Sequence, residues 1–121
     1  MNKIIAILVI GGNFHAAVET ADGFIEASFP NNEKGVEAFS NFAAPLIKRE
    51  TDPYRFCVTS AETNAFGEID HQLMVNGHRP SSLTVSAFKT YLDKHPGVPL
   101  SGLTAAHACL EIFPFLRTMR F

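Results

Sequence analysis

The sequence predicts a mixed α/β domain whose five-stranded sheet holds three antiparallel strands followed by two parallel strands, with helices on both faces. Residues 4–11 form an uncharged, β-branched run, which is typical of a fully buried central strand. Two extended segments follow it, joined at Asp22-Gly23, a dipeptide that is typical of tight hairpins. The later strands alternate with helices, and those connections are long enough for parallel crossovers.

The remaining elements follow from periodicity and from residues that start or stop helices. The expected strands cover residues 14–19, 23–29, 54–59 and 81–85. The first expected helix starts within residues 30–33, is capped by Asn31 or Asn32, and carries an apolar stripe over 36–47. The others are one at 64–75, a short one capped by Ser86, and a last one capped by Ser101 and ended by Pro114. We expect Pro45 to kink or end the first helix.

Length and composition predict one globular domain over residues 1–121, with an apolar C-terminal tail at 114–121. The net charge is −2 and no run of Lys or Arg occurs, which disfavours nucleic acid as the partner. The N-terminal apolar run is too short for a membrane helix and fits a core strand better than a signal peptide, so we expect no membrane association.

The cysteines give a prediction about the compartment. Cys57 lies in a strand-like apolar run and Cys109 in a helix-like one, without a CxxC pairing. We therefore expect both to be buried and reduced, as in a cytoplasmic protein.

This order of elements, β-β-β-α-β-α-β-α-α, is typical of ribonuclease-H-like folds. In many α/β folds the chemistry lies where the first strand ends, and here Asn13 is the first polar side chain after Gly11-Gly12. An Asn at that place also fits a simple turn-forming role. The two glycines do not form a phosphate-binding loop, because no third Gly or GK[ST] follows.

Several segments resemble the N-terminal domain of the Piv-type DEDD transposases and invertases of insertion sequences. Residues 10–14, IGGNF, resemble the Ile-Gly-Ile-Asp-Val opening of that family. Residues 58–73 resemble its Glu-Ala-Thr-Gly-x-Tyr turn, and residues 103–113 resemble its Thr-Asp-x-x-Asp-Ala helix. The similarity covers most of the chain at the level of pattern, while the family's C-terminal domain has no counterpart here.

The resemblance implies a RuvC-like nuclease fold in which Asp, Glu, Asp and Asp gather divalent metal. In this sequence the corresponding positions carry Asn13, Ser60 or Glu62, and then Thr104 and His107 or, with another gap, the neighbouring Ala residues. Two-metal phosphoryl transfer needs several anionic oxygens, and only Glu62 could supply a carboxylate. We therefore expect a catalytically inactive, transposase-derived domain without a cofactor, which acts as a binding module and is associated with a mobile element or phage.

Two alternatives stay open at this point, and with them the question of whether the protein is an enzyme. The first is a Mg²⁺-dependent nuclease in which Glu62, Asp70 and Asp22 form an unorthodox acidic site. The second is an unrelated α/β domain that binds a small molecule.

The C-terminal tail suggests a partner surface. Large apolar residues crowd there, namely Phe113, Phe115, Leu116 and Phe121. They predict either an exposed patch for a homodimer or protein partner, or a segment that packs back on the sheet. A sheet edge is the other surface through which we expect a homodimer to form.

Overall fold

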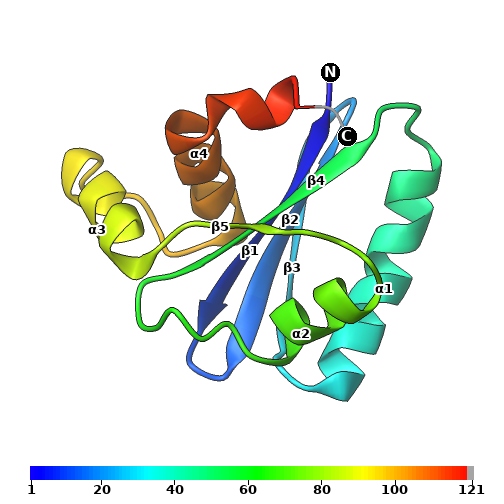
Figure 1. Ribbon diagram of the computed structural model, residues 1–121, viewed down its shortest axis with the longest axis horizontal. Coiled ribbons are helices and arrows are strands. Elements are labelled where there is room, and N and C mark those ends of the chain that lie inside the picture. Colours follow the sequence, from blue (N-terminus) through cyan, green and yellow to red (C-terminus); the bar gives the residue numbers. More distant parts are fainter. Residues whose placement is uncertain (120–121) are drawn as a thin grey trace.

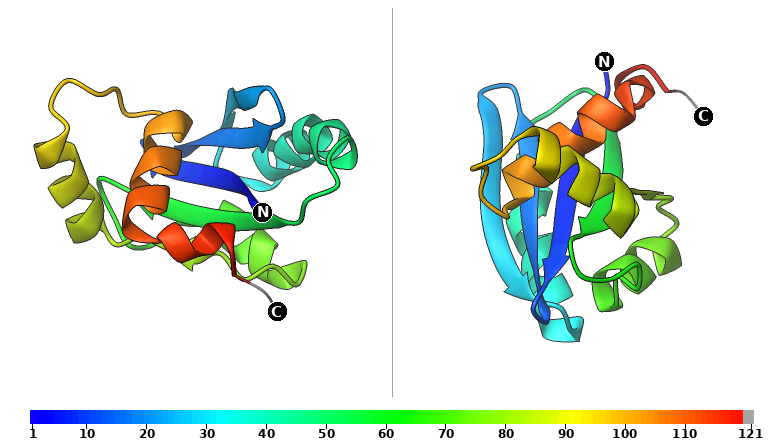
Figure 2. Two further views of the ribbon diagram at one scale, coloured as in Figure 1. Left: turned by 90° about the horizontal axis from the view of Figure 1, so that it is seen from above. Right: turned by 90° about the vertical axis from the view of Figure 1, so that its left-hand side faces the viewer.

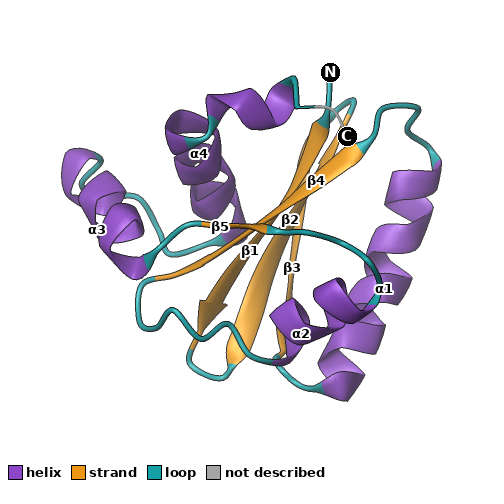
Figure 3. Cartoon of the chain, in the orientation of Figure 1, coloured by secondary structure: helices purple, strands orange, loops and turns teal. Residues whose placement is uncertain are grey.

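The computed structural model describes residues 1–119 and has a mixed five-stranded sheet with the strand order β3-β2-β1-β4-β5 (Figure 1). The elements are β1 (Lys3–Ile10), β2 (Asn13–Thr20), β3 (Gly23–Pro30), α1 (Glu33–Lys48), β4 (Tyr54–Ser60), α2 (Glu68–Val75), β5 (Ser81–Ser82), α3 (Val85–Lys94), α4 (Gly102–Ile112) and the 3-10 helix η1 (Pro114–Arg117). Figure 3 shows how the strands form one layer between helices. The predicted fold class is confirmed.

The apolar run at the N-terminus forms the central strand. β1 pairs antiparallel with β2 and parallel with β4, so both of its edges are hydrogen-bonded. The side chains from Ile4 to Leu8 have no exposed surface, as a continuous run of apolar residues predicts for a strand covered on both faces. The register pairs Ile10 with Asn13 and Val9 with Ser60, which brings both polar residues to the carboxyl end of β1.

Helices cover both faces of the sheet (Figure 2). Alternate residues of β1 belong to two separate core clusters, one on each face. Ile5, Ile7 and Val9 pack under α1 and α2 with Phe39 and Ile69. The intervening residues of β1 pack under α3, α4 and η1 in a second cluster with Phe88, Ala105 and Leu116.

Two helix starts were predicted correctly. The side chain of Asn32 accepts a hydrogen bond from Gly35 N at 2.8 Å at the start of α1, and Ser101 accepts one from Thr104 N at 3.2 Å at the start of α4. Asn32 and Ser101 thus satisfy backbone N–H groups that the first helical turn leaves without partners.

Two other helix starts were wrong. α2 begins at Glu68, because residues 64–67 are held as a loop: Asn64 accepts a hydrogen bond from Val85 N at 2.9 Å, and Gly67 has a φ of 75°. α3 begins one residue before Ser86, capped by Thr84, and this leaves only two residues for β5.

Pro45 does not end α1, which continues to Lys48. Pro45 lies on the exposed side of the helix, where water can reach the backbone carbonyl that has lost its amide partner. The other face of α1 keeps its packing against the sheet through Phe39 and Ala43. Burial on one side therefore outweighs the local cost of proline on the other.

The prediction of reduced cysteines was also wrong. Cys57 on β4 and Cys109 on α4 form a disulfide with a Cα–Cα distance of 6.6 Å, and neither residue has exposed surface. The strand and the helix that carry them pack face to face, a contact between distant segments that their spacing in the sequence does not reveal.

The C-terminal segment docks beside the start of β1. The Asn2 amide donates to Leu116 O at 2.8 Å and to Met119 O at 2.7 Å. Arg117 forms a bidentate ion pair with Glu19 on β2, and its Nη2–Oε2 distance is 2.8 Å. Residues 114–119 are therefore docked on the domain, with Leu116 in its core.

Candidate functional site

The turn between β1 and β2 forms the end of the sheet where the family resemblance places its first acid. Gly11 and Gly12 have φ values of 57° and 78°, a region that favours glycine, and Asn13 starts β2 with an exposed side chain. The turn returns the chain directly into an antiparallel neighbour. Asn13 therefore lies at the rim of this turn with its amide open to solvent.

Glu62 and Ser60 lie next to this turn, and each already has a backbone partner. The Oε2 atom of Glu62 accepts a hydrogen bond from Gly11 N at 3.1 Å. The buried Ser60 hydroxyl accepts from Glu62 N at 3.0 Å and from Thr63 N at 3.3 Å. Three of the predicted positions thus converge at the carboxyl end of β1, and Glu62 is the one carboxylate among them.

The other two predicted positions lie elsewhere. Thr104 is buried in the first turn of α4, where its hydroxyl accepts a hydrogen bond from Ser101 Oγ at 3.2 Å. The His107 ring packs edge-on against Phe24 with centroids 6.4 Å apart. Phe24 pairs with Glu19, which lies roughly 20 Å along β2 from Asn13 at the usual rise per residue. His107 is therefore at the opposite end of the sheet.

These residues do not fit the metal pair that the resemblance implies. Asn13 offers only a neutral carbonyl oxygen. The Ser60 hydroxyl accepts hydrogen bonds from two backbone N–H groups, and one carboxylate oxygen of Glu62 accepts a hydrogen bond from Gly11 N. Two dications need several anionic oxygens within about 4 Å of each other. Within residues 1–119 no three His, Cys, Asp or Glu side chains are grouped so that they could hold a metal ion.

The alternative acidic site is not assembled either. Asp22 lies in the β2–β3 turn, where Thr20 pairs with Gly23, at the other end of the sheet from Glu62. Asp70 lies in the first turn of α2. Glu62, Asp70 and Asp22 therefore occupy separate parts of the fold, and the prediction that they gather is wrong.

The C-terminal interaction candidates have different environments. Leu116 is fully buried in the core, so it contributes nothing to a surface patch. Phe113 is half-buried, and Phe115 is 52% exposed with its ring 5.7 Å from that of Phe113. Phe121 lies outside the described residues. Phe115 is thus the candidate that offers a large exposed apolar surface.

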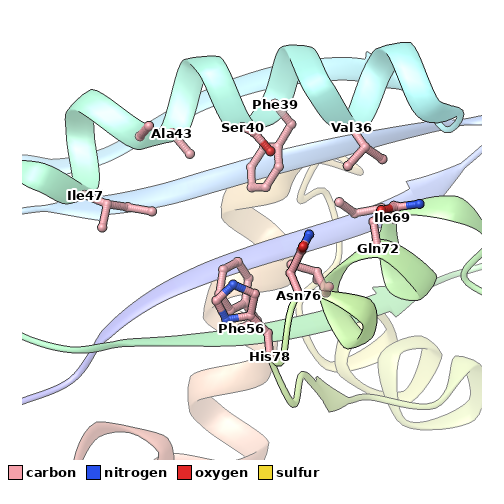
Figure 4. Close-up of a pocket in the computed structure, with 12 residues that line it drawn as sticks. Val36, Phe39, Ser40, Ala43, Ile47, Phe56, Ile69, Gln72, Asn76 and His78 are labelled. Carbon is pink, nitrogen blue, oxygen red and sulfur yellow. The ribbon is translucent and has the colours of Figure 1, made fainter.

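A groove between α1 and α2 was not predicted from the sequence (Figure 4). It contains a hollow of about 190 Å³ whose lining includes Phe56. The Phe56 ring packs at a tilt of 48° against that of His78, with the ring centroids 4.7 Å apart. The apolar stripe of α1 packs on the sheet through Phe39 and Ala43. The small residues Ser40, Ala43 and Ala44 leave space beside it, and only the position of α2 reveals that space.

A second hollow of about 270 Å³ adjoins the first along α1. The two share Val36, Ser40, Gln72 and Asn76 in their walls, and the second adds the carboxylates of Glu33 and Glu37. We call the two hollows together the α1–α2 groove. It is apolar at one end and acidic at the other.

Neither a family model nor a curated protein matches the chain. The resemblance to Piv-type transposases is therefore still a prediction that rests on the residues quoted above. Among residues 1–119, no helix has the length and apolar character that a membrane crossing requires.

Proposed function

We propose that the chain is a catalytically inactive, ribonuclease-H-like domain of transposase ancestry that acts as an interaction module of a mobile element or phage. One observation carries the inactive part of the proposal: of the predicted positions that converge at the end of β1, Glu62 alone has a carboxylate, and that carboxylate is hydrogen-bonded to Gly11 N. The strand order β3-β2-β1-β4-β5, with three antiparallel strands before the crossovers, supports the ribonuclease-H-like part.

The partner surface that we favour is the free edge of β3, paired with a second copy of the chain. β3 has eight residues, and among the strands of residues 1–119 it pairs with β2 alone. An unpaired edge presents backbone N–H and C=O groups that another strand can bind. Ile25 on this strand is 41% exposed, which adds apolar surface beside the edge.

The cytoplasmic prediction is not retained, because it assumed reduced cysteines. Disulfides persist in oxidising compartments and are rare in the cytosol. The Cys57–Cys109 bond therefore favours a protein that matures in an oxidising compartment.

The catalytic part is tested with purified protein on duplex, branched and single-stranded DNA and on RNA, each with Mg²⁺ and with Mn²⁺. We expect no cleavage, and no difference between the wild type and Glu62→Gln. Metal-dependent cleavage that Glu62→Gln removes would overturn the proposal.

The dimer is tested by light scattering after size exclusion. We expect Ile25→Lys to shift the protein towards monomer, because a charge on an edge strand opposes pairing. The matched control is Leu100→Lys, which changes another exposed apolar residue in the loop before α4. A monomeric wild type, or equal effects of the two variants, would rule out this edge.

A further inference from the structure

The α1–α2 groove combines a ring-sized apolar hollow with an acidic margin, and we propose that it binds a small organic cation that carries an aromatic ring. This proposal does not depend on the transposase ancestry or on the absence of nuclease activity. It rests on the shape of the groove, the residues that line it and the distribution of charge along α1.

The apolar hollow exists because of the residue sizes on one face of α1. The residues of α1 that line the hollow are large at Val36, Phe39 and Ile47, and small at the other three positions, Ser40, Ala43 and Ala44. Positions three and four apart lie on one side of a helix, so these small residues together leave a gap facing α2. In Figure 4 the side chains of α1 face those of α2 and β4 across this gap.

The size of the hollow suits a single aromatic ring. Its volume is about 190 Å³, while an apolar cavity of about 150 Å³ is known to take up benzene. The Phe56–His78 pair offers ring surface to a bound ring, and aromatic pairs favour offset or tilted contact. Among residues 1–119, no Asp, Glu, Lys or Arg side chain lines this hollow, so the part of the ligand that enters it is apolar.

The adjoining hollow determines the charge of the ligand. Glu33 and Glu37 line it, and within residues 1–119 neither carboxylate forms a salt bridge. The position of Glu33 in the first turn of α1 is explained by the helix dipole. Glu37 lies one turn further on, where the dipole contributes little, and its carboxylate is available to an ammonium group.

The polar side chains shared by the two hollows complete the site. Ser40, Gln72 and Asn76 line both hollows, so they lie where the ring and the ammonium of one ligand would be joined. Gln72 is held by its donation to Glu68 Oε1 at 2.7 Å. A few polar groups beside an apolar cavity are the usual composition of a small-molecule site.

The probe is phenethylamine, titrated into the ¹⁵N-labelled protein and followed by amide chemical shifts. We expect saturable shifts confined to α1, α2 and the strand beneath them. 2-Phenylethanol should bind about threefold more weakly, since it lacks the charge that pairs with the carboxylates, and 3-phenylpropionate more weakly still. Absence of saturable shifts at the groove, or equal binding of the anion, would overturn the proposal.

Two variants locate the site. Ser40→Leu fills the region shared by both hollows and should abolish binding, whereas Asn41→Leu, on the exposed side of α1, should not change it. Glu37→Gln should reduce the affinity for the amine to that for the alcohol and leave the alcohol unaffected. If Ser40→Leu does not fold, Glu37→Gln still tests the proposal. A Glu37→Gln protein that keeps the wild-type preference for phenethylamine over 2-phenylethanol would contradict it.

Discussion

The backbone N–H of Gly11 donates to the Oε2 atom of Glu62 at 3.1 Å, which ties the turn after β1 to the loop after β4. The Ser60 hydroxyl fixes the same loop by accepting from Glu62 N. At the end of the sheet where the family resemblance implies a metal site, the Glu62 carboxylate and the Ser60 hydroxyl accept hydrogen bonds from backbone N–H groups. These contacts support the proposal that the domain is catalytically inactive.

The first prediction concerns the hydrogen bond from Gly11 N to Glu62, which tethers the turn after β1 to the loop after β4. Glu62→Ala should lower the free energy of unfolding by about 0.5–1 kcal/mol, the lower range for a single hydrogen bond at an exposed site. Glu62→Gln keeps an acceptor oxygen and should lower the free energy of unfolding by less than Glu62→Ala does. Urea denaturation of the variants and the wild type measures both values, and equal stability of the Ala and Gln variants would contradict a tethering role.

The sequence predicts the parts of the fold that local chemistry determines. The uncharged run of β1 can be stable only when buried on both faces, and Asn32 and Ser101 cap helices wherever those helices lie. The Asp22-Gly23 hairpin is also local, since its turn residues determine the connection.

The features that sequence analysis missed depend on contacts between distant segments. Asn64 looked like part of a helix, but its side chain accepts a hydrogen bond from Val85 N and holds an extended loop. The Cys57–Cys109 bond and the α1–α2 groove each require two elements to be placed side by side. Periodicity within one element cannot show either feature.

The same limit applies to the candidate site. Residue type alone shows that Asn13 and Ser60 supply no carboxylate. The pairing of β1 with β2 and β4 brings these two residues to the carboxyl end of β1. His107 was assigned to the same site by the family resemblance, as the counterpart of the family's last Asp. α4 runs over the sheet in a direction that carries His107 to the Phe24 end instead.

The second prediction concerns the disulfide. In the chain-entropy view, a bond that closes a segment with a sequence separation of 52 residues stabilises the fold by about 4 kcal/mol. The Cys57→Ala/Cys109→Ala double variant should therefore show a midpoint of denaturation well below that of the oxidised protein. We also expect no free thiol in the oxidised protein after unfolding without reductant, measured with a thiol reagent. Two free thiols in protein prepared under oxidising conditions would exclude the bond.

The burial of both cysteines also predicts how fast the disulfide is reduced. Neither Cys57 nor Cys109 has exposed surface, so a dithiol reductant cannot reach the sulfurs while α4 stays packed on the sheet. Reduction should be slow in native buffer and fast in denaturant. Equal rates in the two conditions would mean that the bond is accessible in the folded state.

The third prediction concerns the ion pair between Glu19 and Arg117. Both side chains are mostly buried, with exposed fractions of 14% and 27%, and the pair is bidentate. Arg117→Ala should lower the free energy of unfolding by about 2 kcal/mol, as expected for charge-assisted hydrogen bonds. A double-mutant cycle with Glu19→Gln isolates the coupling between them. The Lys3–Asp52 pair, in which Asp52 is 39% exposed and a single N–O contact is formed at 3.2 Å, is the control, and its coupling should be smaller.

The fourth prediction concerns high pH and Tyr54. Burial, followed by the nearby carboxylates of Glu50, Glu19 and Asp52, raises the pKa of Tyr54 from 10.0 to about 12. The hydroxyl also donates to Glu19 O at 2.6 Å, a bond that the phenolate could not make. The folded state therefore favours the neutral phenol more strongly than the unfolded state does.

The direction of the pH dependence follows from that preference. The contribution of Tyr54 is fully present below pH 10, the pKa of the unfolded side chain, and is lost as the pH rises towards 12. A shift of this size, reduced for partial exposure, corresponds to about 1–2 kcal/mol. Tyr54→Phe removes the titrating group, so the difference in stability between the two proteins should shrink over this interval. Burial and then Glu111 also raise the pKa of Tyr91, but Tyr91 is present in both proteins and its effect cancels. Denaturant unfolding at a series of pH values measures the difference, and a constant difference across the interval would show that Tyr54 titrates alike in both states.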